Sequence, residues 1–299
     1  MNILILGGLG FLGRNCGKFL KKSHQVYVVD RVDVDLENYY KCELHQTDKL
    51  VSIIKQNNID CIMHFVSSLI PSSSQEQFLD DIEKVYIPSV KLIEYCALNR
   101  IKFVYISSGG AVYGNQREVF NEKTKREPVS LYGLSKLNFE NALSFYNHMH
   151  NLDYMIIRPS NPYGYGQNLY GKQGIIAVLM GKILRQETFE IWGDGSAVKD
   201  YIYIDDFCFY VDFLIGNSDS WNDVYNIGSG VGNSVNNVLE AFRKCGITLP
   251  RIQYNSASST DVRRMILDCT KLQEKVNHNC VELEDGIQKF WEQVNENTN

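Results

Sequence analysis

The stretch NILILGGLGFLGRN, residues 2–15, places an apolar segment directly before Gly7, Gly10 and Gly13, which are spaced three residues apart. The apolar residues predict a buried strand, and a helix is predicted to follow the glycines. In such a turn the first glycine permits a tight bend, the second lets the backbone approach a pyrophosphate, and the third lets the helix pack against the strand. A glycine triplet can also simply join a strand to a helix. We interpret this one as a dinucleotide-binding turn, with the helix N-terminus facing the phosphates.

A second apolar segment, VYVVD, ends in Asp30, 17 residues after Gly13. An acidic residue at the tip of the second strand accepts hydrogen bonds from the adenosine ribose and repels a 2'-phosphate, which favours NAD. Arg14 and Arg31 weaken this preference because either side chain could reach a 2'-phosphate. The sequence therefore predicts NAD as the cofactor, with NADP less favoured.

Short apolar segments alternate with helix-like stretches between residues 2 and 158. This alternation predicts a parallel sheet with crossover helices. The apolar segments are continuous, as expected when helices cover both faces of the sheet. The predicted fold class is α/β, a Rossmann-like doubly wound parallel sheet with a smaller second lobe.

The composition changes after RPSNPYGYGQ, residues 158–167, to loops rich in Gly, Asn, Tyr and Pro with shorter elements between them. We therefore predict a dinucleotide-binding domain over residues 1–165, which also takes a segment near residues 199–230. Residues 166–299 are predicted to form a smaller, interleaved substrate-binding lobe.

The composition of the 299 residues excludes several classes of protein. A net charge of -5 provides no basic face for nucleic acid, and no apolar run approaches the roughly 18 residues that span a membrane. The first residues look like a buried strand rather than a secretion signal, and the eight cysteines are scattered without a zinc-binding pattern. We therefore expect a cytoplasmic protein without a metal site.

The segment SLYGLSKLNFE, residues 130–140, contains Tyr132 and Lys136 four residues apart, and so on one face of a predicted helix. Free tyrosine has a pKa of roughly 10, and lowering it by about 3 units requires about 4 kcal/mol. One ammonium group at about 4 Å supplies roughly this energy at an effective dielectric constant near 20. The two residues are therefore predicted to form an acid/base couple; the alternative is an ordinary pair on a helix surface.

Seven motifs occur in a characteristic order: GGLGFLG, DCIMHF, SSGGAVYG, YGLSK, RPSNPYG, GDGSAVKDYIYIDD and NIGSG. With these motifs the chain resembles the extended short-chain dehydrogenase/reductase family over nearly its whole length. Within that family it is similar to the nucleotide-sugar 4-epimerases, of which UDP-galactose 4-epimerase is typical. The resemblance implies that Tyr132 is the acid/base and that Lys136 binds the nicotinamide ribose and lowers the pKa of the tyrosine.

The resemblance also implies the residues that bind the cofactor and the substrate. The expected cofactor-binding residues are Gly7, Gly10, Phe11, Leu12, Gly13, Asp30, Arg31, Glu43, Leu44, Phe65, Val66, Ser107, Tyr132, Lys136 and Pro159. The expected substrate-binding residues are Ser108, Asn161, Lys199 and Arg264. For Lys199 and Arg264 the alternative is solvated surface charge.

The chain departs from the family pattern beside the tyrosine. The serine or threonine that assists the tyrosine in the epimerases is replaced by Gly109, and either Ser107 or Ser108 could supply the hydroxyl. We take Ser108 as the catalytic residue. Gly110 and Ala111 stand where the family's dehydratases have an Asp-Glu pair.

Two more family positions differ. The asparagine expected at the nicotinamide is replaced by Lys84 or Val85, and an arginine expected near the substrate diphosphate is replaced by Ser258.

The preferred hypothesis is NAD-dependent 4-epimerisation of a nucleotide-linked hexose through a transient 4-keto sugar. The first alternative is an NAD(P)H-dependent reductase of a nucleotide-linked 4-keto-6-deoxy sugar, which uses the same two residues but consumes reduced cofactor. The second alternative is a non-catalytic protein that senses NAD or acts as a scaffold, since Gly109 replaces a catalytic residue. The resemblance suggests polysaccharide biosynthesis as the context.

A homodimer is also predicted, because the helix that follows Tyr132 is apolar over more of its circumference than one core face needs. The apolar residues are Leu134, Leu137, Ala142, Phe145, Tyr146 and Met149. Burial against the sheet of the same chain is the alternative explanation.

Overall fold

The computed structural model describes residues 1–115, 119–171, 173–256 and 264–296. The chain packs into two compact units. Unit 1 consists of Met1–Gly114, Lys125–Arg158 and Cys208–Tyr225, and unit 2 consists of Asn115–Thr124, Pro159–Phe207 and Asn226–Asn299. The predicted domain boundary at residue 165, with a returning segment near residues 199–230, stays a prediction.

A seven-stranded sheet has the order β10-β6-β5-β4-β1-β2-β3. Each neighbouring pair from β6 to β3 is parallel. The chain order reverses between β1 and β4, which is the doubly wound arrangement that the sequence predicts. The strands are β1 (Asn2–Leu6), β2 (Gln25–Asp30), β3 (Tyr39–Lys41), β4 (Cys61–His64), β5 (Lys102–Ile106), β6 (Tyr154–Pro159) and β10 (Asp223–Ile227).

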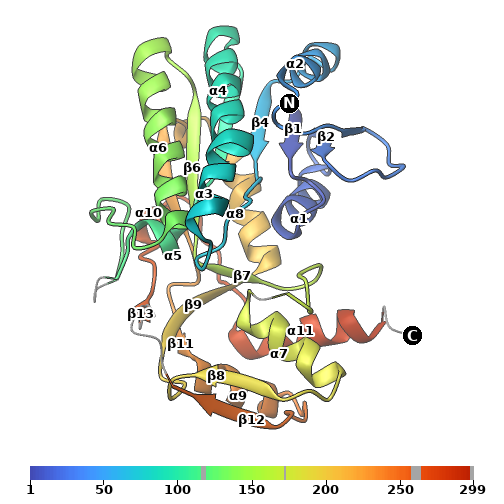
Figure 1. Ribbon diagram of the computed structural model, residues 1–299, viewed down its shortest axis with the longest axis vertical. Coiled ribbons are helices and arrows are strands. Elements are labelled where there is room, and N and C mark those ends of the chain that lie inside the picture. The colour runs from blue at the N-terminus through green and yellow to red at the C-terminus, as the bar shows by residue number, and fades with distance from the viewer. Residues whose placement is uncertain (116–118, 172, 257–263, 297–299) are drawn as a thin grey trace. The chain divides into compact units, whose positions relative to one another are not determined.

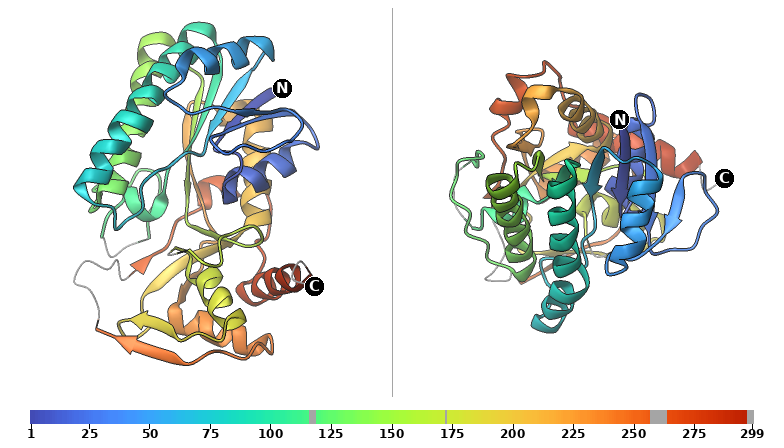
Figure 2. Two further views of the ribbon diagram at one scale, coloured as in Figure 1. Left: turned by 45° about the vertical axis from the view of Figure 1, so that its right-hand side comes forward. Right: turned by 90° about the horizontal axis from the view of Figure 1, so that it is seen from above.

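Helices cover both faces of this sheet. The helices α2 (Thr47–Gln56), α4 (Ile87–Asn99) and α6 (Leu131–His150) lie side by side (Figures 1 and 2). The helices α1 (Phe11–Leu20) and α8 (Ile204–Gly216) contact each other where the sulfur atoms of Cys16 and Cys208 lie 3.6 Å apart. The continuously apolar strands are buried as predicted, and Ile3, Leu4 and Ile5 of β1 have no exposed surface.

Three short helical segments in unit 1 carry residues of the candidate site. Helix α3 (Gln75–Asp81) begins after Ser74, whose hydroxyl accepts a hydrogen bond from the amide of Gln77. A π-helical turn, Ile82–Tyr86, joins α3 to α4. Helix α5 (Gly109–Val112) follows β5.

Unit 2 contains two smaller sheets. One has four strands, β7 (Asn161–Tyr163), β9 (Val198–Tyr203), β11 (Gly232–Ser234) and β13 (Arg264–Met265), and the other pairs β8 (Phe189–Trp192) with β12 (Ile252–Asn255). The accompanying helices are α7 (Ile175–Leu184), α9 (Val235–Lys244), α10 (Thr270–Gln273) and α11 (Leu283–Glu296). The fully buried Asp200 of β9 accepts hydrogen bonds from the amides of Ser229 and Gly230, at 2.9 Å and 3.2 Å, and so fixes the loop before β11.

The surface of α6 retains exposed apolar side chains. Leu134, Phe145 and Met149 are exposed, whereas Leu137 and Tyr146 are half-buried. The homodimer stays a prediction. No helix in the described part of the chain is long and apolar enough to cross a bilayer.

A fully buried carboxylate, Glu140, connects α6 to two strands. Its Oε1 accepts hydrogen bonds from Ser107 Oγ at 2.6 Å and Arg158 Nε at 2.9 Å, and its Oε2 accepts one from Arg158 Nη2 at 2.6 Å. Arg126 adds a contact to Oε2 at 3.2 Å. Arg158 in turn donates to the hydroxyl of Tyr113 at 2.8 Å. All polar atoms of the carboxylate are therefore satisfied inside the protein.

Replacing Glu140 by alanine should lower the free energy of unfolding by about 3–5 kcal/mol, because the buried guanidinium of Arg158 would lose its counter-ion. Urea unfolding measures this change. The matched control is Glu94→Ala on the exposed face of α4, which should change stability by less than about 0.5 kcal/mol. Equal effects of the two substitutions would contradict the proposed importance of the buried pair.

Candidate functional site

The glycine turn between β1 and α1 has the geometry of a phosphate cradle. Gly7 adopts a positive φ of 76°, and a Cβ on Gly13 would lie 2.5 Å from the carbonyl oxygen of Gly7. Gly10 precedes α1 without a side-chain cap, so the first amides of the helix face outward at the turn. A Cβ on Gly10 would lie 3.3 Å from the same Gly7 oxygen and would fill this space. These features fit a pyrophosphate.

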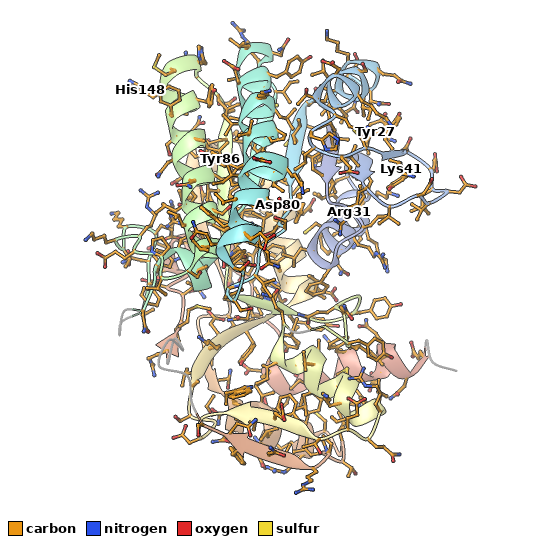
Figure 3. The ribbon with its side chains drawn as sticks, in the orientation of Figure 1. Tyr27, Arg31, Lys41, Asp80, Tyr86 and His148 are labelled. Atoms are coloured by element: carbon orange, nitrogen blue, oxygen red, sulfur yellow. The ribbon has the colours of Figure 1, made fainter. Side chains whose placement is uncertain are left out.

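The carboxylate of Asp30 is held rigidly at the end of β2. Its Oδ2 accepts a hydrogen bond from the amide of Leu9 at 3.0 Å, and its Oδ1 accepts one from the amide of Arg31 at 2.8 Å. Each oxygen retains a second lone pair for a ribose hydroxyl. The side chain of Arg31 extends from the end of the same strand (Figure 3).

A pocket of about 660 Å³ lies beside the glycine turn, between α1 and the loop after β2. Leu9, Gly13, Arg14 and Val32 contribute to its wall. Arg14, one of the two arginines that could reach the 2'-phosphate of NADP, lines this pocket next to the turn. The residues of this part of unit 1 fit a dinucleotide.

Most of the other expected cofactor residues follow parallel strands of the same sheet. Phe65 and Val66 follow β4 and are half-buried, and the amide of Phe65 donates to the Leu6 carbonyl at 3.0 Å. Leu44, after β3, is a core residue, whereas Glu43 beside it is exposed. Since the carboxyl ends of parallel strands share one edge of a sheet, these residues lie along that edge.

Ser107 and Pro159 complete this group. Ser107 directly follows β5, and Pro159 is the buried last residue of β6, the neighbouring strand. Phe11 and Leu12 form the first turn of α1. The cofactor roles of all these residues stay predictions.

Helix α6 begins where Ser130 caps it, because the Ser130 hydroxyl accepts a hydrogen bond from the amide of Gly133 at 3.1 Å. Tyr132 therefore lies in the first turn. A Cβ on Gly133 would lie 2.5 Å from the carbonyl oxygen of Ala111, so only glycine permits this close approach of α5 to α6. The approach brings the Ser108 hydroxyl into a hydrogen bond with Tyr132.

The two serines beside Gly109 face different partners. Ser107 is 2% exposed and its hydroxyl donates to Glu140, whereas the Ser108 hydroxyl contacts Tyr132. Of the two candidates that the sequence leaves open, only Ser108 lies at the phenol. We therefore keep Ser108 as the candidate catalytic serine and assign Ser107 to the buried network.

Lys136 is 5% exposed and lies one turn after Tyr132. Its ammonium donates to the Ile106 carbonyl at 2.9 Å and lies 5.7 Å from the centre of the Tyr132 ring. Burial lowers the pKa of Lys136 to about 8, and the negative charges of Asp81 and Glu140 oppose this lowering.

The expectation that Lys136 alone lowers the pKa of Tyr132 toward neutral pH is wrong for the protein without a bound cofactor. Burial raises the pKa of Tyr132 above its ordinary value, and the hydrogen bond from Ser108 lowers it only in part. The ammonium of Lys136 is directed to the Ile106 carbonyl instead. A further positive charge in the site would favour the phenolate.

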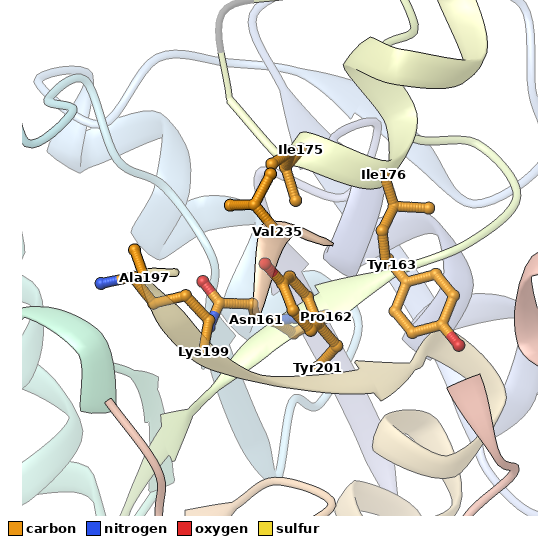
Figure 4. Close-up of a pocket in the computed structure, with 10 residues that line it drawn as sticks. Asn161, Pro162, Tyr163, Ile175, Ile176, Ala197, Lys199, Tyr201 and Val235 are labelled. Carbon is orange, nitrogen blue, oxygen red and sulfur yellow. The ribbon is translucent and has the colours of Figure 1, made fainter. Parts of the chain in front are cut away.

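Asn161 and Lys199 line a pocket of about 240 Å³ within unit 2 (Figure 4). Its wall is completed by apolar and aromatic residues from β7, α7, β9 and the start of α9, including Ile175, Tyr201 and Val235. The amide of the Asn161 side chain donates to the carbonyl of Asp200 at 2.8 Å. Such a mixture of apolar walls and few polar groups is typical of ligand sites.

The other described residues that were considered for substrate or nicotinamide binding do not line this pocket. Arg264 is exposed on β13, paired in register with Val198, and it does not line this pocket. Ser258 lies outside the described residues. Val85 is buried in the π-helical turn, and Lys84 forms an exposed ion pair with Asp80 at 2.7 Å, so neither supplies the amide of the expected asparagine.

Three residues of the site were not predicted from the sequence: Glu140 and Asp81, whose charges act on Lys136, and Tyr201 in the pocket of Asn161 and Lys199. The sequence does contain a signal for Glu140, because this residue stands eight residues after Tyr132 and four after Lys136, on the same helix face. Asp81 had none, because its contacts involve residues distant in sequence.

Replacing Lys136 by methionine should stabilise the protein at neutral pH. The pKa of Lys136 is about 8 in the folded protein and 10.5 in the unfolded chain, so below pH 8 burial of the charged amine reduces stability. The free energy of unfolding should rise by up to about 3 kcal/mol at pH 7, and the gain should shrink between pH 8 and 10.5. Urea unfolding across this range measures it, with Lys91→Met on the exposed face of α4 as the control. A constant difference at every pH would refute the assignment.

Comparison with known proteins agrees with this geometry. The family model described as "NAD dependent epimerase/dehydratase family" matches residues 3–228. A putative UDP-glucose 4-epimerase of Methanocaldococcus jannaschii is 27% identical, covering 99% of this chain and 100% of the relative. The dTDP-4-dehydro-6-deoxyglucose reductase of Escherichia coli is also 27% identical, covering 98% and 97%.

Among solved structures, the UDP-glucose 4-epimerase of Thermotoga maritima with UDP-glucose superposes with a TM-score of 0.90 at 30% identity, and the alignment covers 100% of both chains. The family model covers well over half of the sequence and includes the glycine turn, Tyr132 and Lys136. The chain therefore belongs to the NAD-dependent epimerase/dehydratase family.

Proposed function

We propose that this protein catalyses the NAD-dependent 4-epimerisation of a nucleotide-linked hexose through a transient 4-keto sugar. The observation that carries the proposal is the group formed by Ser108, Tyr132 and Lys136. The phenol is hydrogen-bonded to a serine hydroxyl on one side and lies one helical turn from a buried ammonium. This group can accept and return one proton at a sugar hydroxyl.

The cofactor residues would be the glycine turn and Asp30. Gly10 and the first turn of α1 would hold the pyrophosphate, and Asp30 would accept the ribose hydroxyls. The charge of Asp30 favours NAD over NADP, because it repels a 2'-phosphate. When bound, NAD would supply the reversible oxidation and reduction at C4 of the sugar.

Tyr132 would take the proton from the O4 hydroxyl of the sugar and return it after the sugar has turned over. Ser108 would donate a hydrogen bond that stabilises the phenolate and orients the sugar hydroxyl. Lys136 would supply positive charge beside the phenolate. Burial raises the pKa of Tyr132, and a positive charge that enters the site would lower it again.

The pocket of Asn161 and Lys199 is proposed to bind the nucleotide end of the substrate. Lys199 provides a positive charge for a diphosphate, and Ile175, Tyr201 and Val235 provide apolar surface for a nucleoside. The solved Thermotoga maritima epimerase, which has the same fold, was determined with UDP-glucose.

The second candidate function is reduction of a nucleotide-linked 4-keto-6-deoxy sugar. It is favoured by the Escherichia coli reductase, which is as similar to this chain as the Methanocaldococcus jannaschii relative. Val85 in place of the expected asparagine also fits an enzyme that differs from the epimerases around the nicotinamide.

The decisive experiment measures sugar configuration and reduced cofactor together. The purified protein, with its dinucleotide identified, is incubated with UDP-, dTDP- and GDP-hexoses and with 4-keto sugars. The proposal predicts conversion of one hexose to its C4 epimer without net change in cofactor, and a loss of at least about 10²-fold in turnover for Tyr132→Phe. Consumption of reduced cofactor mole for mole with a 4-keto sugar would identify a reductase. Dinucleotide binding without turnover of any sugar would support a non-catalytic protein.

The two serines before Gly109 should have separable effects. Ser108→Ala should lower kcat by about 10²-fold or more, because it removes the hydroxyl at the phenol. Ser107→Ala should leave kcat within a few fold but lower the free energy of unfolding by about 1–3 kcal/mol, because the buried Oε1 atom of Glu140 loses one of its two donors. Steady-state kinetics and urea unfolding of both variants measure this. The reverse pattern would assign the catalytic hydroxyl to Ser107.

A further inference from the structure

A second buried carboxylate, Asp81, lies beside the catalytic helix α6. It is the last residue of α3 and is 3% exposed. Its Oδ1 accepts a hydrogen bond from Ser68 Oγ at 2.5 Å, and its Oδ2 accepts one from Ser135 Oγ at 2.8 Å. Asp81 thus joins three segments that are distant in sequence: the loop after β4, the end of α3 and the catalytic helix.

The hydrogen bond between Ser135 and Asp81 lies on the turn of α6 that carries the two proposed catalytic residues. Ser135 stands between Tyr132 and Lys136 and is 8% exposed. A hydrogen bond from this residue to Asp81 restricts rotation and sliding of the helix between the two proposed catalytic side chains. Directional hydrogen bonds of this kind hold reactive groups in position.

Asp80 and Asp81, two adjacent acids at the end of α3, have different surroundings just before the π-helical turn. Asp80 is exposed (Figure 3) and pairs with Lys84 at the surface, whereas Asp81 is directed inward. Such π-helical turns are frequent at functional sites. The chain therefore contains a buried acid and a natural control residue side by side.

The charge of Asp81 needs compensation, because a buried carboxylate is costly when its hydrogen bonds come only from neutral groups. The hydrogen bonds of Asp81 go to two hydroxyl groups, whereas Glu140 shares its charge with Arg158 and Arg126. Lys136 directly follows Ser135, whose hydroxyl lies 2.8 Å from Asp81 Oδ2, and the charge of Asp81 raises the pKa of Lys136 against the lowering by burial.

The other groups that face Lys136 are either uncharged or already paired with another residue. Tyr105 on β5 lies 5.0 Å below the ammonium, and burial raises the pKa of its phenol. Burial lowers the pKa of His64 on β4 to about 3, so its ring is neutral. On α6 itself the neighbours are Tyr132, a phenol, and Glu140, which is already paired.

We propose that Asp81 is a positioning residue, which fixes the catalytic turn of α6 through Ser135 and keeps Lys136 in its ammonium form as a counter-ion. The inference rests on the proposed role of Lys136 beside Tyr132. It adds that a carboxylate outside the tyrosine-lysine motif sets the upper pH limit of the reaction.

Three substitutions separate the two effects of Asp81. Asp81→Asn keeps the size of the side chain and one acceptor oxygen, replaces the other oxygen by an amide group that can donate to a serine hydroxyl, and removes the charge. Ser135→Ala removes the link to α6 but keeps the charge. Asp80→Asn is the matched control, because it removes an exposed acid from the neighbouring position.

The first readout needs no substrate and therefore tests the inference separately from the proposed function. For each protein, the free energy of unfolding is compared with that of the same protein carrying Lys136→Met. The pH at which this difference begins to shrink reports the pKa of Lys136 in the folded protein. This pH should fall by about one unit or more in Asp81→Asn and stay unchanged in Asp80→Asn. An unchanged titration in Asp81→Asn, or an equal shift in Asp80→Asn, would overturn the counter-ion role.

The second readout is the pH profile of kcat/KM with whichever substrate the wild type converts. Asp81→Asn should move the alkaline limb to lower pH by the same amount. Ser135→Ala should lower kcat by about 10-fold without moving that limb, since only the orientation changes. If the limb moves equally in Ser135→Ala, the charge of Asp81 is not its cause and the proposal fails.

If Asp81→Asn alone does not fold, the double variant Asp81→Asn with Lys136→Met decides. Removing both charges leaves neither uncompensated, so the double variant should recover a cooperative unfolding transition. Failure of the double variant to regain stability would show that Asp81 does not act through Lys136, and the proposal would be rejected.

Discussion

The hydrogen bonds that converge on Glu140 set the geometry of the whole candidate site. Ser107 at the end of β5 and Arg158 near the end of β6 both donate to this carboxylate from α6. The helix is therefore held at a fixed height and rotation relative to the edge of the sheet. Ser108 follows Ser107 directly and contacts Tyr132 in the first turn of the same helix.

Lys136 interacts electrostatically with two buried carboxylates, Asp81 and Glu140, and the burial of its own charge reduces the stability of the protein. Burial makes its ammonium easier to deprotonate, while Asp81 and Glu140 oppose that tendency. A lysine poised in this way can respond to charge that enters or leaves the site. Groups with perturbed pKa values of this kind are concentrated at functional sites.

The sequence predicted the doubly wound sheet, the glycine turn and the helix position of Tyr132, because each depends on local patterns that leave few alternatives. Continuous apolar strands and glycines at fixed spacing are both readable within about 20 residues. The sequence did not reveal Asp81, which meets Ser68 and Ser135 only after folding. It also overestimated the effect of Lys136 on Tyr132, because one-turn spacing does not specify where the ammonium points.

The segment Cys208–Tyr225 belongs to unit 1, although Pro159–Phe207 of unit 2 separates it in the chain from the preceding segment of unit 1. It contains most of α8 and the beginning of β10, which borders β6 in the large sheet. The sheet therefore cannot be completed during synthesis until more than two thirds of the polypeptide has left the ribosome. Contacts over such sequence separations slow folding, so the nascent protein exposes the edge of β6 for longer than a chain with contiguous domains would.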